Sequence, residues 1–218
     1  MLIAGIDEAG RGPCLGPMVL AVTTIEKKDE EELLKIGVKD SKQLSAKERE
    51  RQFKLITKVA NEFASSHIKA EEIDSLRDFK SLNEIEAMRI GSLLNNLQEK
   101  PSIVYIDSPD IIQGNFGKRI KKYVSYDLIL VTEHKADVNY PIVSAASIIA
   151  KVERDNAIEE LAKKYGNIGS GYPHDEDTIN FLKKWLKSHK DLPDCARKSW
   201  ITSQALLNDK YQKKIFEV

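Results

Sequence analysis

The pattern of apolar and polar positions predicts a chain whose strands come mainly before its helices. Residues 2–6 and residues 18–25 are apolar runs, and a loop containing Gly and Pro separates them. Two such runs predict an antiparallel hairpin. Further apolar runs predict strands at 102–107 and 126–132, and residues 65–69 predict a short additional strand.

Apolar positions at helical spacing predict the helices. Ser45 followed by Glu48 is typical of a helix start, and the apolar positions after it predict a helix that ends at about Phe63. Ser81 and Glu84 repeat that start. Other helices are predicted at 30–36, 71–97 with a break near 78–80, 142–165, 175–188 and 199–213, with helix or loop at 111–122. This order predicts an α/β fold: a mixed sheet flanked by helices, with a C-terminal helical cap.

The length of 218 residues fits one sizeable α/β domain with a helical appendage. We predict a catalytic domain at residues 1–165 and a C-terminal helical region at 166–218 that packs on it. No apolar run approaches the roughly 20 residues needed to span a bilayer. Acidic Asp7 and Glu8 lie where a secretory leader would be apolar. We therefore expect a cytoplasmic protein with no membrane partner.

Charge and cysteine content narrow the function only slightly. The 34 basic and 34 acidic residues cancel, so overall charge does not indicate a nucleic-acid partner. Cys14 and Cys195 lie far apart in the chain without a Cys-x-x-Cys pattern, which argues against a zinc site or a redox pair. We expect both to be packing residues.

The first strand ends in two adjacent carboxylates, Asp7 and Glu8. Successive side chains of a strand point to opposite faces, so these two converge only where the strand ends. Gly10 and Gly12 allow close approach of the backbone to a ligand, and Arg11 supplies a cation suited to phosphate. Their spacing does not match the phosphate-loop or dinucleotide fingerprints. The stretch predicts a metal-dependent site that acts on phosphate.

Two further acids are predicted to lie near the first pair. Asp107 ends a second strand, and Asp137 follows a third strand just before a long helix. Ligands gather at the carboxyl ends of strands in α/β sheets. Four converging carboxylates would stay ionised by binding hard cations such as Mg²⁺ or Mn²⁺. A single acid at a strand end is more often a solvated group or a helix cap, but an acid pair within an apolar strand is harder to explain that way.

Several motifs resemble ribonuclease HII in content and order. They occupy residues 5–13, 40–44, 105–107, 136–155 and 171–173. The first and the fourth are long enough to be specific, and together the motifs extend over most of the chain. Residues 197–200 resemble the archaeal branch of that family more than the bacterial branch.

The resemblance implies a ribonuclease H-like fold and a hydrolase, an endonuclease that cuts the RNA strand of RNA/DNA hybrids. It also implies cleavage at single ribonucleotides embedded in duplex DNA, leaving a 3′-hydroxyl and a 5′-phosphate. By motif, Asp7, Glu8, Asp107 and Asp137 become the catalytic, metal-binding carboxylates for two Mg²⁺ or Mn²⁺ ions, with Asp7 bridging them. The same resemblance implies a monomer that acts in DNA replication and ribonucleotide excision repair.

The resemblance also assigns substrate contacts. Gly10, Arg11 and Gly12 would sense the ribose 2′-hydroxyl and the adjacent phosphate, while Tyr172 would stack on the following sugar and favour deoxyribose. From the sequence alone, Tyr172 is more often a packing aromatic in a Gly-rich loop. The motif lysines Lys39, Lys42 and Lys151 would contact phosphates, although a generic lysine is a solvated amine. The region 166–218 would help to bind the hybrid.

Some alternatives stay open at this stage. Another nuclease of the same fold, such as ribonuclease HIII or a junction resolvase, shares the acids, but HIII usually carries an additional N-terminal domain. A catalytically silent hybrid-binding module is a second alternative, and the four acids argue against it. Basic residues at 118–122 fit either a solvated helix face or a duplex-binding edge. Gln212 and Ile215 begin a sliding-clamp motif whose paired aromatics are missing, so clamp contact is at most weak.

Overall fold

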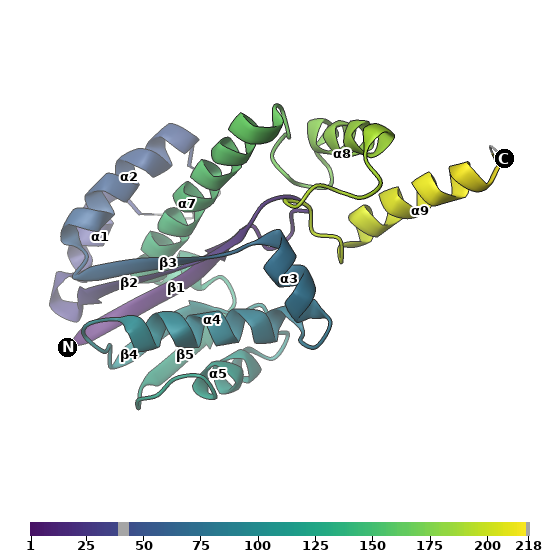
Figure 1. The fold of residues 1–218 in the computed structure, drawn as a ribbon. Coiled ribbons are helices and arrows are strands. Elements are labelled where there is room, and N and C mark those ends of the chain that lie inside the picture. The colour runs from purple at the N-terminus through teal and green to yellow at the C-terminus, as the bar shows by residue number, and fades with distance from the viewer. Residues whose placement is uncertain (39–43, 217–218) are drawn as a thin grey trace. The chain divides into compact units, whose positions relative to one another are not determined.

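The computed structural model describes residues 1–38 and 44–216 and divides them into two compact units (Figure 1). Unit 1 comprises residues 1–9, 19–67 and 81–153, and unit 2 comprises residues 10–18, 68–80 and 154–218. Each unit combines segments that are distant in the chain. The domain division predicted at residue 165 stays a prediction.

Unit 1 is built on a mixed sheet whose strand order is β3-β2-β1-β4-β5. The strands are β1 (Leu2–Ala9), β2 (Met18–Glu26), β3 (Glu62–Ile68), β4 (Ile103–Asp107) and β5 (Ile129–Glu133). Strands β1 and β2 pair antiparallel, which confirms the predicted hairpin, while β4 runs parallel to both β1 and β5. Three parallel carboxyl ends therefore meet at one edge of the sheet.

Helices cover both faces of this sheet (Figure 1). On one face lie α1 (Glu30–Ile36), α2 (Ala46–Val59) and the first half of α7 (Pro141–Tyr165), and on the other lie α4 (Leu82–Asn96) and α5 (Gln113–Lys121). The short elements are η1 (Lys27–Asp29) and α6 (Ala136–Asn139). The core under α7 includes Ile3, Ile25, Ile56 and Ile148, all at most 1% exposed. This packing fixes α7 against β1.

Both predicted helix starts are confirmed. The backbone N–H of Glu48 donates to Ser45 Oγ at 3.2 Å, and Glu84 makes the same bond to Ser81 Oγ. The predicted end at Phe63 is wrong, because α2 ends at Val59 and Phe63 lies in β3. The Phe63 ring meets Phe53 of α2 edge-on, at 6.1 Å between ring centroids. Phe63 therefore packs against α2 from β3 and does not belong to the helix itself.

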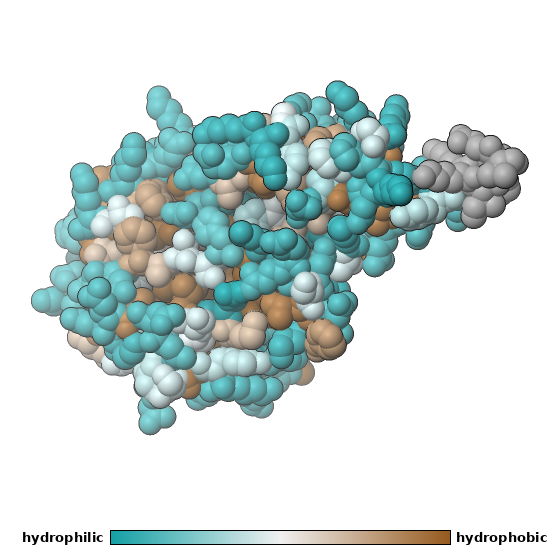
Figure 2. All heavy atoms as spheres, in the orientation of Figure 1, coloured by the Kyte–Doolittle hydropathy of each residue, from teal (hydrophilic) through white to brown (hydrophobic). Residues whose placement is uncertain are grey.

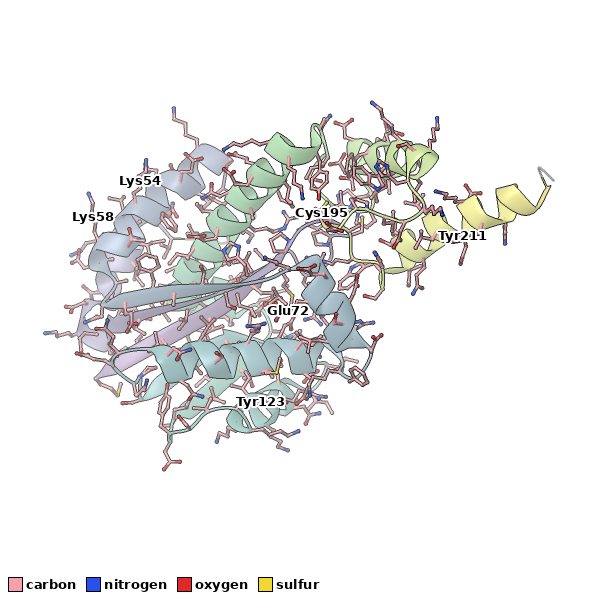
Figure 3. The ribbon with its side chains drawn as sticks, in the orientation of Figure 1. Lys54, Lys58, Glu72, Tyr123, Cys195 and Tyr211 are labelled. Carbon is pink, nitrogen blue, oxygen red and sulfur yellow. The ribbon has the colours of Figure 1, made fainter. Side chains whose placement is uncertain are left out.

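Unit 2 contains α3 (Ala70–Arg77), α8 (Glu176–Ser188), α9 (Ile201–Phe216) and the second half of α7. Its core includes Cys14, Leu15, Leu182 and Cys195. Both cysteines are buried and free, which confirms them as packing residues; Cys195 is labelled in Figure 3. A β-bridge joins Leu15 to Ala196. Segments 181 positions apart in sequence therefore form one core.

The outer surface is mostly polar on the face that Figure 2 draws, with hydrophobic residues in small groups. In Figure 3, Lys54 and Lys58 stand on the solvent side of α2. Within residues 1–38 and 44–216, no helix is both long and apolar enough to cross a bilayer.

Candidate active site

Asp7 and Asp107 lie just beyond the last paired residues of the parallel strands β1 and β4. The register pairs Ile6 of β1 with Ile106 of β4, so the two aspartates follow one step further along each strand. Residues in register on parallel strands point to the same face of the sheet. Asp7 is only 7% exposed, whereas Asp107 is half-buried. The structure thus brings together two of the acids that the sequence predicted.

Asp7 lies in a strongly perturbed environment. Burial raises the pKa of its carboxyl well above the ordinary value, and the nearby charge of Glu8 raises it further. A hydrogen bond from Ser147, the charge of Lys151 and the backbone N–H of Glu8, 2.8 Å from Asp7 Oδ1, oppose that shift of the pKa. Two adjacent carboxylates, one of them buried, form a place where an added cation is favourable.

Asp137 reaches the same strand edge through the turn that carries it. Asp107 Oδ1 accepts a hydrogen bond of 3.0 Å from the N–H of Ala136, the first residue of α6. Asp137 is the next residue and is only 6% exposed. Lys135, just before it, has a backbone φ of 58°, a value that residues other than glycine rarely adopt. The local strain and the bond to Asp107 together fix the direction in which the chain enters α6.

Glu133 and His134 were not assigned a role from the sequence. Glu133 pairs with Asp107 in the β4–β5 register, and its Oε1 accepts a bond of 2.7 Å from the hydroxyl of Tyr140. His134 Nδ1 lies 3.1 Å from the carbonyl oxygen of Ser108, so the ring contacts the loop after β4. Glu133 directly follows the strand predicted at 126–132, and this position was the signal that its carboxylate lies near the end of that strand.

The predicted lysines have different outcomes. Lys151 Nζ donates to Ser147 Oγ at 3.2 Å, and Ser147 is fully buried beside Asp7. Lys151 is therefore close to the carboxylates, and its contact with phosphate stays a prediction. Lys39 and Lys42 lie outside the described residues.

One residue of the basic stretch 118–122 has internal partners. Arg119 forms ion pairs with Glu84 at 2.9 Å and with Asp110 at 3.2 Å. Its guanidinium joins α5 to α4 and to the loop after β4. Arg119 therefore connects elements of unit 1 and is also part of a basic helix face.

The carboxylates fit a hard divalent cation in chemistry and charge. Carboxylate oxygens and the negative charge of Glu8 beside the buried Asp7 carboxyl are what Mg²⁺ and Mn²⁺ prefer. Among the described residues, however, no three acidic, His or Cys side chains are arranged as a ready coordination group. Mg²⁺ is commonly held by one or two carboxylates with water and substrate phosphate supplying the rest. The donor set fits that open mode rather than a closed protein cage.

In unit 2, the predicted turn at residues 10–12 lies against Arg154. Gly10 is buried with φ of 78°, and a Cβ built there would meet Arg154 Nε at 2.5 Å and the carbonyl oxygen of Pro17 at 2.8 Å. Only glycine satisfies both the conformation and the space. Arg154 Nη2 also donates to the carbonyl oxygen of Ser170 at 2.9 Å, so one side chain links the turn to the loop before Tyr172.

Tyr172 lies beside this turn. A Cβ built on Gly12 would be 3.9 Å from Tyr172 Cε1, and the Arg154 guanidinium carbon lies 5.2 Å from the Tyr172 ring centroid. The ring is half-buried, so part of it remains accessible. The structure therefore brings the two predicted recognition elements together within unit 2.

The loop that carries Tyr172 is held on both sides. The buried hydroxyl of Thr178 accepts from the N–H of Gly171 and donates to the carbonyl oxygen of Ile168, both at 2.9 Å. The carbonyl oxygen of Gly171 accepts from the N–H of Cys14 at 2.8 Å. These bonds limit the freedom of the Tyr172 backbone.

Two residues that sequence reasoning did not assign also hold the turn. Arg197 donates to the carbonyl oxygens of Gly10 and Arg11, and Trp200 Nε1 donates to that of Gly12. The resemblance of residues 197–200 to one branch of a family was the only signal available for them.

Comparisons with known proteins agree with this geometry. A family model described as ribonuclease HII matches residues 4–203. Ribonuclease HII of Pyrococcus furiosus is 45% identical over 202 residues, which cover 93% of this chain and 89% of that protein. The crystal structure of ribonuclease H2 from Pyrococcus horikoshii has a TM-score of 0.92 at 42% identity, covering 97% of this chain and all of the other.

A second solved structure has the same fold in a complex. The PCNA:RNase HII complex from Archaeoglobus fulgidus matches with a TM-score of 0.84 and 41% identity, covering 92% of this chain and 95% of that chain. Fold, strand-end carboxylates and these likenesses define an endoribonuclease of the ribonuclease H class. Within that class, the chain belongs to the ribonuclease HII family.

Proposed function

We propose that this enzyme hydrolyses the RNA strand of RNA/DNA hybrids and cuts at single ribonucleotides within duplex DNA, with two Mg²⁺ or Mn²⁺ ions. The observation that carries the proposal is the placement of Asp7 beside Asp107 on parallel strands, with the turn of Asp137 bonded to Asp107. Paired acids of this kind suit phosphodiester hydrolysis that leaves a 3′-hydroxyl and a 5′-phosphate.

In this proposal Asp7, Glu8, Asp107 and Asp137 hold the cations. The bound cations supply charge neutralisation and lower the pKa of water, so no protein nucleophile is required. Ser147 orients the Asp7 carboxylate by donating a hydrogen bond to it. Lys151, bonded to Ser147, places a positive charge where the scissile phosphate would approach.

Recognition is assigned to unit 2 in the same proposal. The backbone of Gly10 and Gly12 would approach the ribose closely enough to test for its 2′-hydroxyl, with Arg11 on the adjacent phosphate. Tyr172 would stack on the next sugar. The support is the geometry within the unit: the turn, the half-buried Tyr172 ring and Arg154 are in mutual contact.

Partners beyond the nucleic acid are also proposals. The Archaeoglobus relative is described in complex with PCNA, and Gln212 on α9 is exposed in this chain. We propose a weak clamp contact through the C-terminal region, where Gln212 and Ile215 begin the motif. We also propose that the enzyme is a cytoplasmic monomer that acts in replication and in ribonucleotide removal.

The test uses a DNA duplex with one embedded ribonucleotide and a matching all-DNA duplex. With Mg²⁺, we expect a single cut at the ribonucleotide and none in the all-DNA duplex. Asp7→Asn should lower the rate by at least about a thousandfold, because catalytic carboxylates carry most of the cation binding. Gel mobility of the two products, with and without phosphatase, identifies the new ends.

The matched control is Asp127→Asn, which removes an exposed acid before β5 and should leave the rate unchanged. Binding of the duplex without a metal-dependent cut in the unmodified chain would contradict the proposal and leave only a binding module.

A further inference from the structure

Arg197 is a buried cation whose described acceptors are backbone carbonyls. It is 0% exposed. Its Nε donates to the Gly16 carbonyl oxygen at 3.1 Å, Nη1 to that of Arg11 at 3.0 Å, and Nη2 to that of Gly10 at 2.6 Å. The planar guanidinium presents donors in a fixed fork, so it sets the relative directions of the three carbonyls.

Trp200 extends this set by one residue. Its indole Nε1 donates to the carbonyl oxygen of Gly12 at 3.2 Å, and its ring lies 4.8 Å from the guanidinium carbon of Arg197. Three successive carbonyls of the turn, at residues 10, 11 and 12, are therefore all directed to the segment 197–200.

The carbonyl directions determine where the amides point. In a planar trans peptide, the C=O of one residue and the N–H of the next point in opposite directions. The described backbone contains no cis peptide bond. With the Gly10 and Arg11 carbonyls directed at Arg197, the N–H groups of Arg11 and Gly12 point away from it. Those two amides are the ones that a bound sugar would meet on the outer side of the turn.

The environment of Arg197 indicates a specific role. Burial, together with the smaller effect of the charge of Arg154, lowers the pKa of its guanidinium to about 10. Burying a charge is costly, and filling the same space with apolar side chains is often neutral or stabilising. Apolar side chains could fill this space, so packing alone does not explain an arginine here. The need to orient three backbone carbonyls does explain it.

We propose that Arg197 is a positioning residue for ribose recognition. Together with Trp200, it holds the backbone at residues 10–12 so that the Arg11 and Gly12 amides face the 2′-hydroxyl. The inference rests on the proposed function, because it assumes that this turn tests the sugar. It extends the recognition machinery to the segment 197–200.

The test compares affinities for two duplexes of one sequence, all-DNA or with one ribonucleotide, with Ca²⁺ replacing Mg²⁺ to prevent cleavage. Arg197→Lys keeps the charge but loses the fork. We expect the preference for the ribonucleotide duplex to fall about tenfold, with affinity for all-DNA changed less than about twofold. At saturating substrate, the cleavage rate should fall as well.

Two control variants separate positioning from general stability. Leu182→Ala weakens the core of unit 2 but leaves the hydrogen bonds from Arg197 and Trp200 to the turn in place, so its thermal midpoint should fall while the preference stays. Lys163→Ala removes an exposed cation of α7 that pairs with Glu160 at 2.5 Å, and it should change neither preference nor rate. Equal loss of preference in Arg197→Lys and Leu182→Ala would reduce Arg197 to a structural residue and overturn the inference.

A milder variant keeps the inference testable if Arg197→Lys does not fold. Trp200→Phe retains an aromatic ring over Arg197 but removes the donor to the Gly12 carbonyl, and it should lower the preference about fivefold. A preference unchanged in this variant would overturn the inference while the proposed function stands. No preference in the unmodified chain would instead contradict the proposed function itself.

Discussion

Tyr172 combines a restrained backbone with a partly exposed aromatic ring. Gly171 in its loop donates to the Thr178 hydroxyl and accepts from the Cys14 N–H, which restrains the backbone, and Arg154 lies over the ring. The ring keeps part of its surface exposed beside Gly12. A residue with this placement is suited to contact a substrate at little cost in conformational entropy.

Replacing Tyr172 should therefore affect selection more than binding. With Tyr172→Ala we expect the preference for an RNA-to-DNA junction over continuous RNA to fall about tenfold, because stacking on one base or sugar contributes a limited share of affinity. Cleavage rates on junction and all-RNA strands paired with DNA measure this. Tyr172→Phe keeps the ring and should retain the preference. Equal losses on both substrates in Tyr172→Ala would exclude stacking at the junction.

Among the elements, α7 and β1 approach each other unusually closely. A Cβ built on Gly5 would lie 2.2 Å from the carbonyl oxygen of Ile142, in the first turn of α7. That turn precedes Ser147, which bonds to Asp7, and Lys151, which bonds to Ser147 and acts on Asp7 through its charge. The absence of a side chain at Gly5 thus sets the distance between the acid and the helix that orients it.

Gly5→Ala should destabilise unit 1 by about 3 kcal/mol, since backbone must move to accommodate the methyl group. Urea unfolding followed by circular dichroism gives the free energy of unfolding. Gly114→Ala in α5 is the matched control: apart from its chain neighbours and the backbone of its own helix, no heavy atom lies within 4 Å of the added Cβ, so the change should stabilise the helix by about 0.5–1 kcal/mol. A neutral Gly5→Ala variant would show that the two elements separate easily.

A polar network joins α4 to α5 and the loop after Asp107. Tyr123, labelled in Figure 3, donates from its hydroxyl to Glu84 at 2.6 Å, and Arg119 bridges Glu84 and Asp110. The Tyr123 bond, followed by the Arg119 bond, lowers the pKa of Glu84 below its ordinary 4.5. An acid with a lowered folded-state pKa stabilises the fold above its unfolded pKa and loses that effect as the pH falls through the folded value.

Glu84→Gln should consequently lower the thermal midpoint at pH 7. The difference from the unmodified chain should narrow once the pH drops below about 4.5, where the unfolded acid begins to be protonated. Melting curves from pH 7 to pH 3 measure it. A difference that widens in acid would mean that the network does not favour the carboxylate form.

For the whole molecule, the carboxylate site should link stability to divalent cations. A ligand that binds only the folded state raises the free energy of unfolding. At about ten times the dissociation constant, Mg²⁺ or Mn²⁺ should raise the thermal midpoint by about 3 °C. Chelation should abolish cleavage but preserve the circular dichroism spectrum. Asp7→Asn should show a smaller cation-dependent shift, and cleavage that survives chelation would exclude metal-dependent chemistry.

The sequence was informative about this molecule wherever local chemistry decides the structure. Strand ends predicted that Asp7 and Asp107 meet, and capping patterns located Ser45 and Ser81. Apolar spacing wrongly predicted that Phe63 belongs to the helix. A strand that packs on a helix also carries apolar side chains toward it, so the spacing alone does not separate the two.

The contacts of Arg197 could not be predicted in this way. They join positions up to 187 residues apart, and no local pattern encodes such a pairing. The motif resemblance located the turn, but it did not show what holds the turn in place.

The long separation between Gly10 and Arg197 also has a consequence for synthesis. Proteins emerge from the ribosome N-terminus first, and domains begin to fold as they emerge. Every segment of unit 1 has been synthesised by residue 153, whereas Arg197 follows Gly10 by 187 positions. The growing chain thus holds all four acids before the turn has acquired its buried anchor. The residues proposed to hold the cations are therefore synthesised before the contacts that fix the turn proposed to test the sugar.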